Sequence, residues 1–246
     1  MRGITRFARL LVPSVLMVCA MSLGAPCLAQ EVDVPTPPAP PDAGEGRGPV
    51  FAPSAWAVFN TPLRKQIDLK VYGFYIGDLK VPVAQFDLPI RATRFLTVTP
   101  SYMYYSVPAS GLNELAPEPP GFTDSYKEHQ FRVDGTVAFS VRKFEISARN
   151  MYVRRFRPDP SDDTNRYRGR IGIAHPITVQ GHIWKPFASY ERFYERNVGW
   201  NRNRLWTGVT LPVNKRVMLQ PSYLWETTEG TRDVRYLLFG VIVNTR

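Results

Sequence analysis

The stretch HQFRVDGTVAFSVRKFEISARN, residues 129–150, determines the fold class that we expect for this chain. Polar side chains such as Arg132 and Asp134 recur at every second position, and apolar side chains lie between them. A period of two residues is typical of a β-strand whose two faces meet different surroundings. The phase reverses at Arg142 and Lys143, because a two-residue turn between antiparallel strands keeps both apolar faces on the same side. The stretch therefore predicts a β-hairpin with one charged face and one apolar face.

Alternation of this kind continues through most of the chain. Ten segments have the length of about ten residues that a tilted strand needs to cross a lipid bilayer. The last of them is apolar on both faces, so the pattern does not show which of its faces points outward. Residues 54–60 are a further candidate strand, which either spans the membrane together with an unrecognised twelfth strand or lies at the rim or in the lumen. The ten segments are residues 66–75, 81–91, 95–106, 128–141, 144–156, 166–174, 183–195, 204–213, 216–226 and 232–243.

The apolar face of these strands is expected to meet lipid rather than a protein core. Strands of soluble proteins average about five or six residues, and no other part of the chain remains to cover so large a sheet. Aromatic residues such as Tyr102, Tyr152 and Trp225 gather near the segment ends, as in the interfacial girdles of membrane barrels. Short and long connections alternate along the chain, and the short turns of such barrels face the periplasm. With ten strands, both ends of the chain would lie on the side of the short turns. We therefore predict an all-β fold, a transmembrane up-and-down antiparallel β-barrel of about 10 strands, with about 12 as the alternative.

The N-terminal residues are expected to serve export rather than the fold. Residues 1–30 combine a basic start, an apolar stretch and the small residues of APCLAQ, as a secretory signal peptide does. They contain both cysteines, Cys19 and Cys27, so the mature chain has no thiol for a disulfide, a metal or a nucleophile. Residues 31–50, EVDVPTPPAPPDAGEGRGPV, are rich in proline and predict an extended periplasmic linker. The outer-membrane barrel then occupies residues 51–246.

The positive charge of the chain bears on its partners. The net charge is +10 at pH 7, and three of these charges are arginines of the signal peptide, which leaves +7 for the mature chain. A basic chain can bind nucleic acid, but export argues against that partner. We expect instead contact with outer-membrane lipid and lipopolysaccharide, delivery by the barrel-assembly machinery, and a location in the bacterial cell outer membrane; the pattern specifies no oligomeric state.

The second half of the chain resembles a known bacterial family. The segments RKFEISARNMYVRRF, NRYRGRIGIAHPI and PFASYERFYER, followed by NRLWTGVTLPV and QPSYLWET, present Arg-rich strands in a characteristic order, with an acid at Glu191 and an Asn-Arg pair at residues 203–204. This order is similar to that of a family of outer-membrane barrels known as the domain of unknown function twenty-four-ninety. The likeness covers most of residues 54–243 and is clearest from Arg142 onward. It implies an outer-membrane barrel and implies no activity.

If the apolar face meets lipid, the polar face lines a narrow lumen that side chains largely fill. Cations outnumber carboxylates on this face, with the densest row in RYRGR at residues 166–170. Pairing between arginine and carboxylate is the natural way to satisfy such charges. We therefore predict a network of salt bridges in the lumen, with an anion-preferring pore as the alternative. Its candidate members are Lys70, Asp87, Arg132, Asp134, Glu145, Arg149, Arg166, Arg168, Arg170, Lys185, Glu191, Arg204, Arg216 and Glu226.

The sequence predicts neither a catalytic site nor a metal site. The mature chain has three histidines, His129, His175 and His182, which match no hydrolase motif and no metal-ligand spacing. We therefore expect no cofactor and no enzyme activity, and either a structural role or that of a narrow channel. Two alternatives stay open. One is an outer-membrane enzyme that modifies lipid or peptide near the acids of residues 159–163, and the other is a soluble periplasmic barrel that binds an apolar ligand inside, as lipocalins do.

Overall fold

The barrel lies in the second of two units into which the chain divides, residues 1–41 and residues 42–246. In the computed structural model of the protein, the described residues are 49–76, 81–107, 125–157, 164–196, 198–229 and 233–245. The predicted signal peptide lies outside these ranges, as do all but the last two residues of the predicted linker and the acids of residues 159–163. Within the described ranges no helix is long and apolar enough to cross a membrane.

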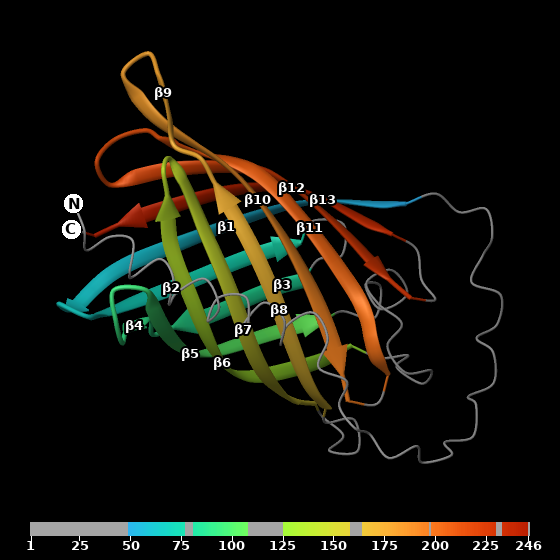
Figure 1. Cartoon of the computed structure of the whole chain (residues 1–246). Coiled ribbons are helices and arrows are strands. Elements are labelled where there is room, and N and C mark those ends of the chain that lie inside the picture. Colours follow the sequence, from blue (N-terminus) through green and yellow to red (C-terminus); the bar gives the residue numbers. More distant parts are fainter. Residues whose placement is uncertain are drawn as a thin grey trace. The chain divides into compact units, whose positions relative to one another are not determined.

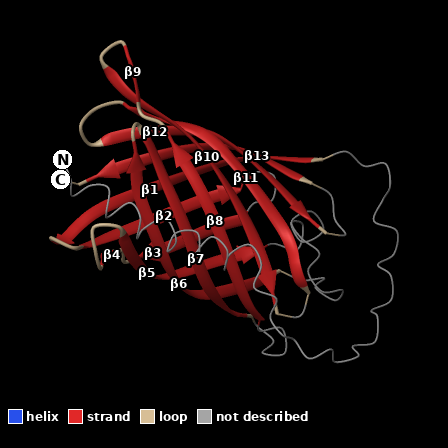
Figure 2. Ribbon diagram, viewed as in Figure 1, coloured by secondary structure: helices blue, strands red, loops and turns tan. Residues whose placement is uncertain are grey.

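The described residues of the second unit form one closed sheet of thirteen strands (Figures 1 and 2). Two strands are fragments. β4 continues β3 after an interruption at Leu88 and Pro89, and β9 follows β8 and pairs with β10 beyond the main sheet. The barrel wall therefore has eleven strands. The bounds are β1 (Val50–Arg64), β2 (Ile67–Ile76), β3 (Val81–Asp87), β4 (Ile90–Arg91), β5 (Leu96–Val107), β6 (Tyr126–Val141), β7 (Phe144–Phe156), β8 (Thr164–Ala174), β9 (Ile177–Val179), β10 (His182–Glu195), β11 (Gly199–Pro212), β12 (Val217–Thr228) and β13 (Val234–Asn244).

The strand β1 closes the barrel through one parallel pairing. It runs antiparallel to β2, with Ala57 opposite Gly73, and parallel to β13, with Ala57 opposite Val241. The count of eleven lies between the ten and the twelve that the sequence suggested, and no twelfth strand is needed in the described residues. Because one strand is added to ten, Val50 lies at the end of the barrel that carries the longer connections. This corrects the expectation that both ends of the barrel chain lie at the short turns.

The two faces of each strand are distributed as the alternation predicts. On β6, Phe131 and Val133 are 56% and 52% exposed on the outer surface, whereas Arg132 and Asp134 beside them are 4% and 6% exposed in the lumen. A lipocalin-like barrel with an apolar ligand inside requires the opposite arrangement. The faces match those of an outer-membrane-type barrel, with apolar residues outward and charged residues inward.

The hairpin between β6 and β7 has the predicted two-residue turn. Val141 lies opposite Phe144, and Arg142 between them has a φ of 56°. Left-handed backbone of this kind is what tight hairpin turns require, because it matches the twist of the two strands. Both strands therefore keep their apolar faces on the outer surface.

Two glycines allow aromatic side chains to lie flat against the lumen wall. Trp56 lies opposite Gly240, and Phe187 lies opposite Gly208, in each case on the neighbouring strand. A Cβ atom added to Gly240 would lie 2.2 Å from the indole ring of Trp56. One added to Gly208 would lie 2.5 Å from Cβ of Ser222 and 2.9 Å from Cζ of Phe187. The rings thus occupy the space that a side chain would take, a known way to cover glycine within a sheet.

Candidate functional site

Five charged side chains form a row across neighbouring strands on the lumen face. Arg149 on β7 lies opposite Arg170 on β8, and Arg170 lies opposite Glu191 on β10. Glu191 lies opposite Arg204 on β11, which lies opposite Glu226 on β12. Side chains that are directly opposed in antiparallel strands have their Cβ atoms about 4.5–5.5 Å apart. The register of the strands therefore brings these predicted network residues together.

Glu191 is the centre of this row. Its two carboxylate oxygens accept hydrogen bonds from Nη2 of Arg149 at 2.7 Å and from Nη2 of Arg168 at 2.8 Å. Glu191 is buried. A carboxylate is retained inside a protein when cations and hydrogen bonds occupy its oxygens, and Glu191 meets that condition.

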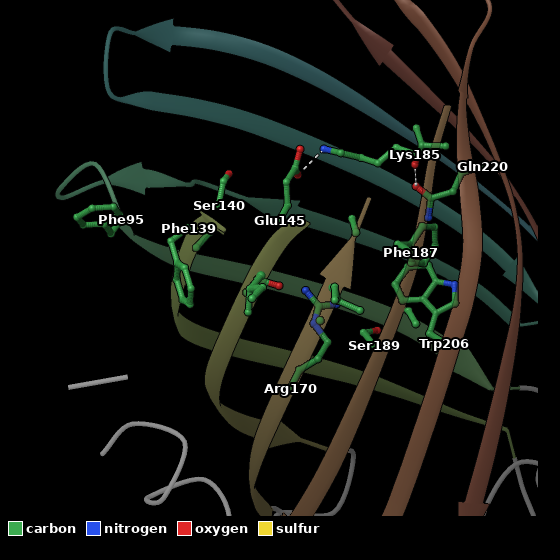
Figure 3. A pocket seen from close by; sticks show the side chains of 18 of the residues that line it. Phe95, Phe139, Ser140, Glu145, Arg170, Lys185, Phe187, Ser189, Trp206 and Gln220 are labelled. Carbon is green, nitrogen blue, oxygen red and sulfur yellow. Dashed lines mark hydrogen bonds and ion pairs between the residues drawn. The ribbon is translucent and has the colours of Figure 1, made fainter. Parts of the chain in front are cut away.

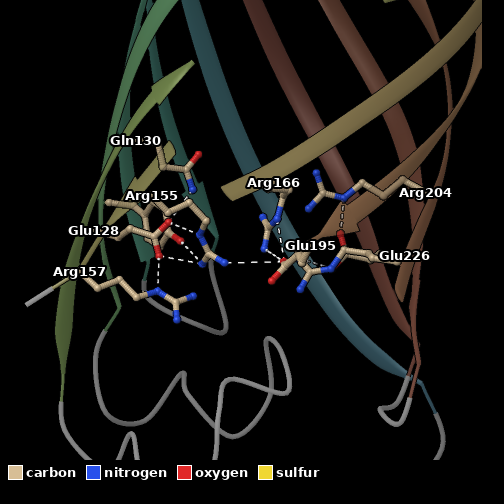
Figure 4. Close-up of polar contacts among 10 residues, drawn as sticks. Glu128, Gln130, Arg155, Arg157, Arg166, Glu195, Arg204 and Glu226 are labelled. Atoms are coloured by element: carbon tan, nitrogen blue, oxygen red, sulfur yellow. Dashed lines mark hydrogen bonds and ion pairs between the residues drawn. The ribbon is translucent and has the colours of Figure 1, made fainter. Parts of the chain in front are cut away.

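A second group of ion pairs lies nearer the longer connections and is centred on Glu128 of β6 (Figure 4). Arg155 donates to Glu128 through Nε at 2.6 Å and through Nη2 at 2.7 Å, which makes the pair bidentate. Arg157 donates through Nε at 3.1 Å, and Gln130 donates through Nε2 at 2.7 Å. Glu128 is fully buried and Arg155 is 2% exposed, so water has no access to this pair.

The same group extends across the lumen to β8, β10, β11 and β12. Nη1 of Arg155 lies 3.7 Å from Oε1 of Glu195, and the same oxygen accepts a hydrogen bond from Nε of Arg166 at 2.7 Å. Glu226 is paired with Arg204 and, at 3.6 Å, with Nη1 of Arg202. Figure 4 shows the side chains of Arg155 and Arg166 directed toward Glu195. We refer to the following residues as the ion-paired layer: Glu128, Arg155, Arg157, Arg166, Glu195, Arg202, Arg204 and Glu226.

A single aromatic ring lies at the centre of the arginines. Phe193 on β10 is 1% exposed and lies between Glu191 and Glu195 on the lumen face. Four guanidinium groups lie over its ring, at 4.5 Å to 5.7 Å from the centroid. The negative face of an aromatic ring attracts such cations, so Phe193 stabilises an excess of positive charge that carboxylates alone do not offset. The four residues are Arg166, Arg168, Arg202 and Arg204.

Other predicted members of the network lie closer to the short turns. Nη2 of Arg132 lies 3.7 Å from Oδ1 of Asp87, and Lys70 lies opposite Asp87 on the neighbouring strand. Asp134 accepts a hydrogen bond from the hydroxyl of Thr136 at 3.0 Å. Lys185 and Glu145 form a pair whose Nζ and Oε2 atoms are 2.6 Å apart, with side chains 39% and 45% exposed. This last pair is half in water and contributes little compared with the buried pairs.

Two predicted residues stand apart from the network. Arg170 faces the lumen, but among the described residues its side chain has no ion pair and no hydrogen bond, because Arg149 and Arg168 occupy the oxygens of Glu191. Arg216 is not a lumen residue. It is exposed in the turn between β11 and β12, one residue before β12 begins, and its backbone N–H donates to the side chain of Asn214 at 2.8 Å. The predicted strand of residues 216–226 began one residue too early, because Arg216 belongs to the turn that Asn214 stabilises.

The ion-paired layer contains members that the sequence reasoning missed. Glu128, Arg157, Glu195 and Arg202 lie at or near strand ends, on the same face as the network residues already predicted on β6, β7, β10 and β11. The alternation of polar residues along each strand was therefore the sequence signal that could have identified them. Phe193 was missed for a different reason, since an aromatic residue on the polar face breaks the alternation by which the face was defined.

The opposite side of the lumen is apolar. Ala52 of β1, Val81 of β3, and Val234 and Tyr236 of β13 are buried together in a cluster near the longer connections. Leu238 packs against this cluster. We call this side the apolar wall; it is formed by the lumen faces of β13 and β1 and by the parts of β2 and β3 nearer the longer connections. We call the lumen faces of β6, β7, β8, β10 and β11 the charged wall.

A cavity of about 580 Å³ lies between the charged wall and the short turns (Figure 3). Arg170, Lys185, Glu145 and Gln220 contribute polar groups to its lining, together with serines of three strands. Phe187 and Trp206 contribute aromatic rings, which meet edge to face with centroids 5.6 Å apart. We call this space the short-turn cavity.

Within the described residues the structure shows no metal site, and two histidines contact aromatic side chains. Among the residues that the structure describes, no group of three or more His, Cys, Asp and Glu side chains is placed to hold a metal ion. Nδ1 of His129 lies 2.7 Å from the hydroxyl of Tyr102, and His175 lies against the ring of Phe144. These contacts involve side chains of the outward phase.

A family model and two solved structures are similar to this chain. A family model described as a protein of unknown function, DUF2490, matches residues 83–236. No curated protein matches the chain. LpxR from Salmonella typhimurium is 12% identical in sequence and has a TM-score of 0.44, over 72% of this chain and 83% of that chain. Outer-membrane expressed OmpT of Vibrio cholerae is also 12% identical, with a TM-score of 0.36 over 66% of this chain and 51% of that chain. Both are similarities of fold alone.

Proposed function

The chain belongs to the DUF2490 family, whose function is unknown, and we propose that it is a structural barrel of the bacterial outer membrane whose lumen is closed by its own ion pairs. This proposal rests on the burial of the ion-paired layer. Glu128, Arg155 and Glu226 face the lumen, yet they are 0%, 2% and 2% exposed. Side chains that line an aqueous pore would be reached by water. The layer therefore favours a closed barrel over the anion-preferring pore.

The proposed route to the membrane follows from the surface and the ends of the chain. The signal peptide of residues 1–30 directs export, the barrel-assembly machinery inserts the chain, and the apolar outer surface then meets lipid and lipopolysaccharide. Nucleic acid is no partner in that compartment. The short turns face the periplasm and the longer connections face outward, as in barrels of this class.

We further propose that the barrel has no catalytic site. Among the described residues, arginines hold the buried carboxylates Glu128, Glu191 and Glu226 in ion pairs. His129 and His175 contact aromatic side chains instead. Comparing the lipid A and phospholipid composition of cells with and without the protein tests this point. An altered acyl chain or headgroup pattern would favour the outer-membrane enzyme instead.

The closed lumen is tested by conductance in planar bilayers. The mature protein should insert without opening ion-conducting steps. A triple variant, Glu128→Ser with Arg155→Ser and Arg157→Ser, removes the buried carboxylate together with both arginines bonded to it, and vacates part of the layer. Glu195 keeps its bond to Arg166. The triple variant should conduct, whereas the double variant Glu145→Ser with Lys185→Ser, at the mouth of the lumen, should stay closed. Steady conductance by the unaltered protein would overturn the proposal.

Location and orientation are tested by fractionation and labelling. The protein should be in the outer-membrane fraction and should migrate differently on a denaturing gel before and after boiling. Because the mature chain has no cysteine, single cysteines report cleanly on its two ends. In intact cells a membrane-impermeant maleimide should label Pro49→Cys, at the start of β1, and should label Asn214→Cys, in a short turn, only after permeabilisation. The reverse pattern would favour the periplasmic linker that ten strands implied.

A further inference from the structure

We infer that the short-turn cavity is a binding site for a small monocarboxylate with an aromatic or short aliphatic group, which enters from the side of the short turns. The inference goes beyond a structural role for the barrel. Three observations carry it: an unpaired cation at the inner end of the cavity, a row of small residues that creates the space, and aromatic rings along its side.

The unpaired cation is Arg170. The other lumen arginines of its strand, Arg166 and Arg168, are both bonded to carboxylates. Arg170 lies opposite Glu191, but both oxygens of Glu191 are held by Arg149 and Arg168. Figure 3 shows the guanidinium of Arg170 among the residues that line the cavity. A guanidinium whose N–H groups bond to no carboxylate of the protein presents parallel N–H groups that match the carboxylate of a ligand.

The space beside Arg170 results from the next row of the wall toward the short turns. In that row Ser147 on β7, Gly172 on β8 and Ser189 on β10 lie directly opposite one another. The row of Arg149, Arg170 and Glu191 beside it is filled by long side chains. A Cβ atom added to Gly172 would lie 3.0 Å from Oγ of Ser147. A side chain at this position would therefore press against the Ser147 hydroxyl, which the glycine leaves in place. Small residues on three adjacent strands leave room for a ligand next to the cation.

The aromatic rings and the charges at the mouth indicate which anion fits. Phe187 and Trp206 present apolar surface, and Nε1 of Trp206 is buried without a partner in the described part of the chain. At the mouth, Lys185 is offset by Glu145. Arg94 also lines the cavity, and its guanidinium lies over the ring of Phe95. The charge of a ligand is then met by the one guanidinium of Arg170, which suits a single carboxylate better than a phosphate dianion. A volume of about 580 Å³ lies in the ordinary range for small-molecule sites.

The test measures binding of 2-naphthoate, benzoate and octanoate to the full mature chain in lipid nanodiscs, by equilibrium dialysis. The neutral 2-naphthamide controls for partition into lipid, because it has the same ring system without the charge. We expect saturable binding of at least one carboxylate and none of the amide. Arg170→Gln should weaken binding at least tenfold, since a hydrogen-bonded charge pair is lost.

Two further variants make the result decisive. Ser189→Leu keeps Arg170 and fills the space beside it, so it should also weaken binding at least tenfold. Arg216→Gln removes an exposed arginine of a turn outside the cavity and should bind as the unaltered protein does. A band that migrates differently on a denaturing gel before and after boiling shows that each variant is folded. If Arg170→Gln does not fold, the binding result for Ser189→Leu tests the inference in its place. Absence of saturable binding for all three carboxylates, or equal binding by the folded Arg170→Gln or Ser189→Leu variant, would overturn the inference.

Discussion

The charged wall and the apolar wall belong to one lumen, yet different forces hold them. On the charged wall, Glu191 is fixed by hydrogen bonds from two arginines. On the apolar wall, Val234 and Tyr236 are buried against Ala52 as in the core of a soluble protein. The outer surfaces of both walls are apolar, as Phe131 on one and Phe239 on the other show. A barrel whose outside is uniform can therefore close its inside by ion pairs on one side and by packing on the other.

The largest effect is expected where the charged wall is broken at its centre. Glu191→Gln keeps the shape of the side chain and removes the charge that offsets Arg149 and Arg168. Removing one partner of a buried ion pair costs about 3–5 kcal/mol, because the other charge stays buried without a partner. Unfolding in urea, followed by the heat-modifiable band and by fluorescence, should show a loss of this size.

The control for this prediction is Glu145→Gln, which removes a carboxylate from the half-exposed pair with Lys185. Exposed pairs contribute about 1 kcal/mol or less, so the control should unfold close to the unaltered protein. Equal losses in the two variants would show that burial of the charged wall does not set its stability.

The apolar wall is expected to break by overpacking rather than by loss of charge. Gly240→Val places a side chain where the indole ring of Trp56 lies, since even a Cβ atom would be 2.2 Å from the ring. Overpacking of this kind costs about 1–3 kcal/mol. Gly73→Val is the matched control, because nothing lies within 4 Å of a Cβ atom added to Gly73 on β2. The same urea titrations should separate the two variants, and a neutral Gly240→Val would mean that Trp56 moves away at no cost.

A smaller effect is expected at Phe193, where the two kinds of interaction meet. Phe193→Leu keeps an apolar side chain in the layer and removes the ring on which four guanidinium groups lie. A desolvated cation–π contact is worth up to about 2 kcal/mol, and the leucine retains part of the packing. The loss should therefore be about 1–2 kcal/mol in the urea titration. Phe193→Tyr keeps the ring and should lose less than Phe193→Leu; the opposite ranking would assign the role of Phe193 to packing alone.

The difference between the walls also explains how far the sequence could be read. Period two appears only where the two faces of a strand differ, so the hairpin of β6 and β7 was predicted with its turn and both phases. The strand β13 could not be phased because Leu237 on its outer face and Leu238 on its lumen face are both apolar. For the same reason Trp56 and Val58, which face the lumen on β1, gave little sign that this strand spans the barrel wall.

The parts of the site that the sequence did not predict depend on register between strands. That Arg149 and Arg168 both reach Glu191, and that this leaves Arg170 unpaired, follows from which residues lie opposite each other on β7, β8 and β10. Register between strands joined by long connections is not encoded in any one segment. The charges of the lumen were therefore predictable, whereas their pairing and the short-turn cavity were not.

The smallest effect is expected for an ion pair outside both walls, at the rim of the short turns. Arg91 donates to Oδ2 of Asp68 at 2.7 Å, with side chains 55% and 21% exposed. Arg91→Gln should change the free energy of unfolding by less than about 1 kcal/mol, and the change should vanish at about 1 M salt, where charges in water are screened within about 3 Å. Urea is the required denaturant, because guanidinium is itself a salt. The loss in Glu191→Gln should persist at high salt, since ions do not enter the buried layer; if it too disappears, water reaches the charged wall and the lumen is not closed.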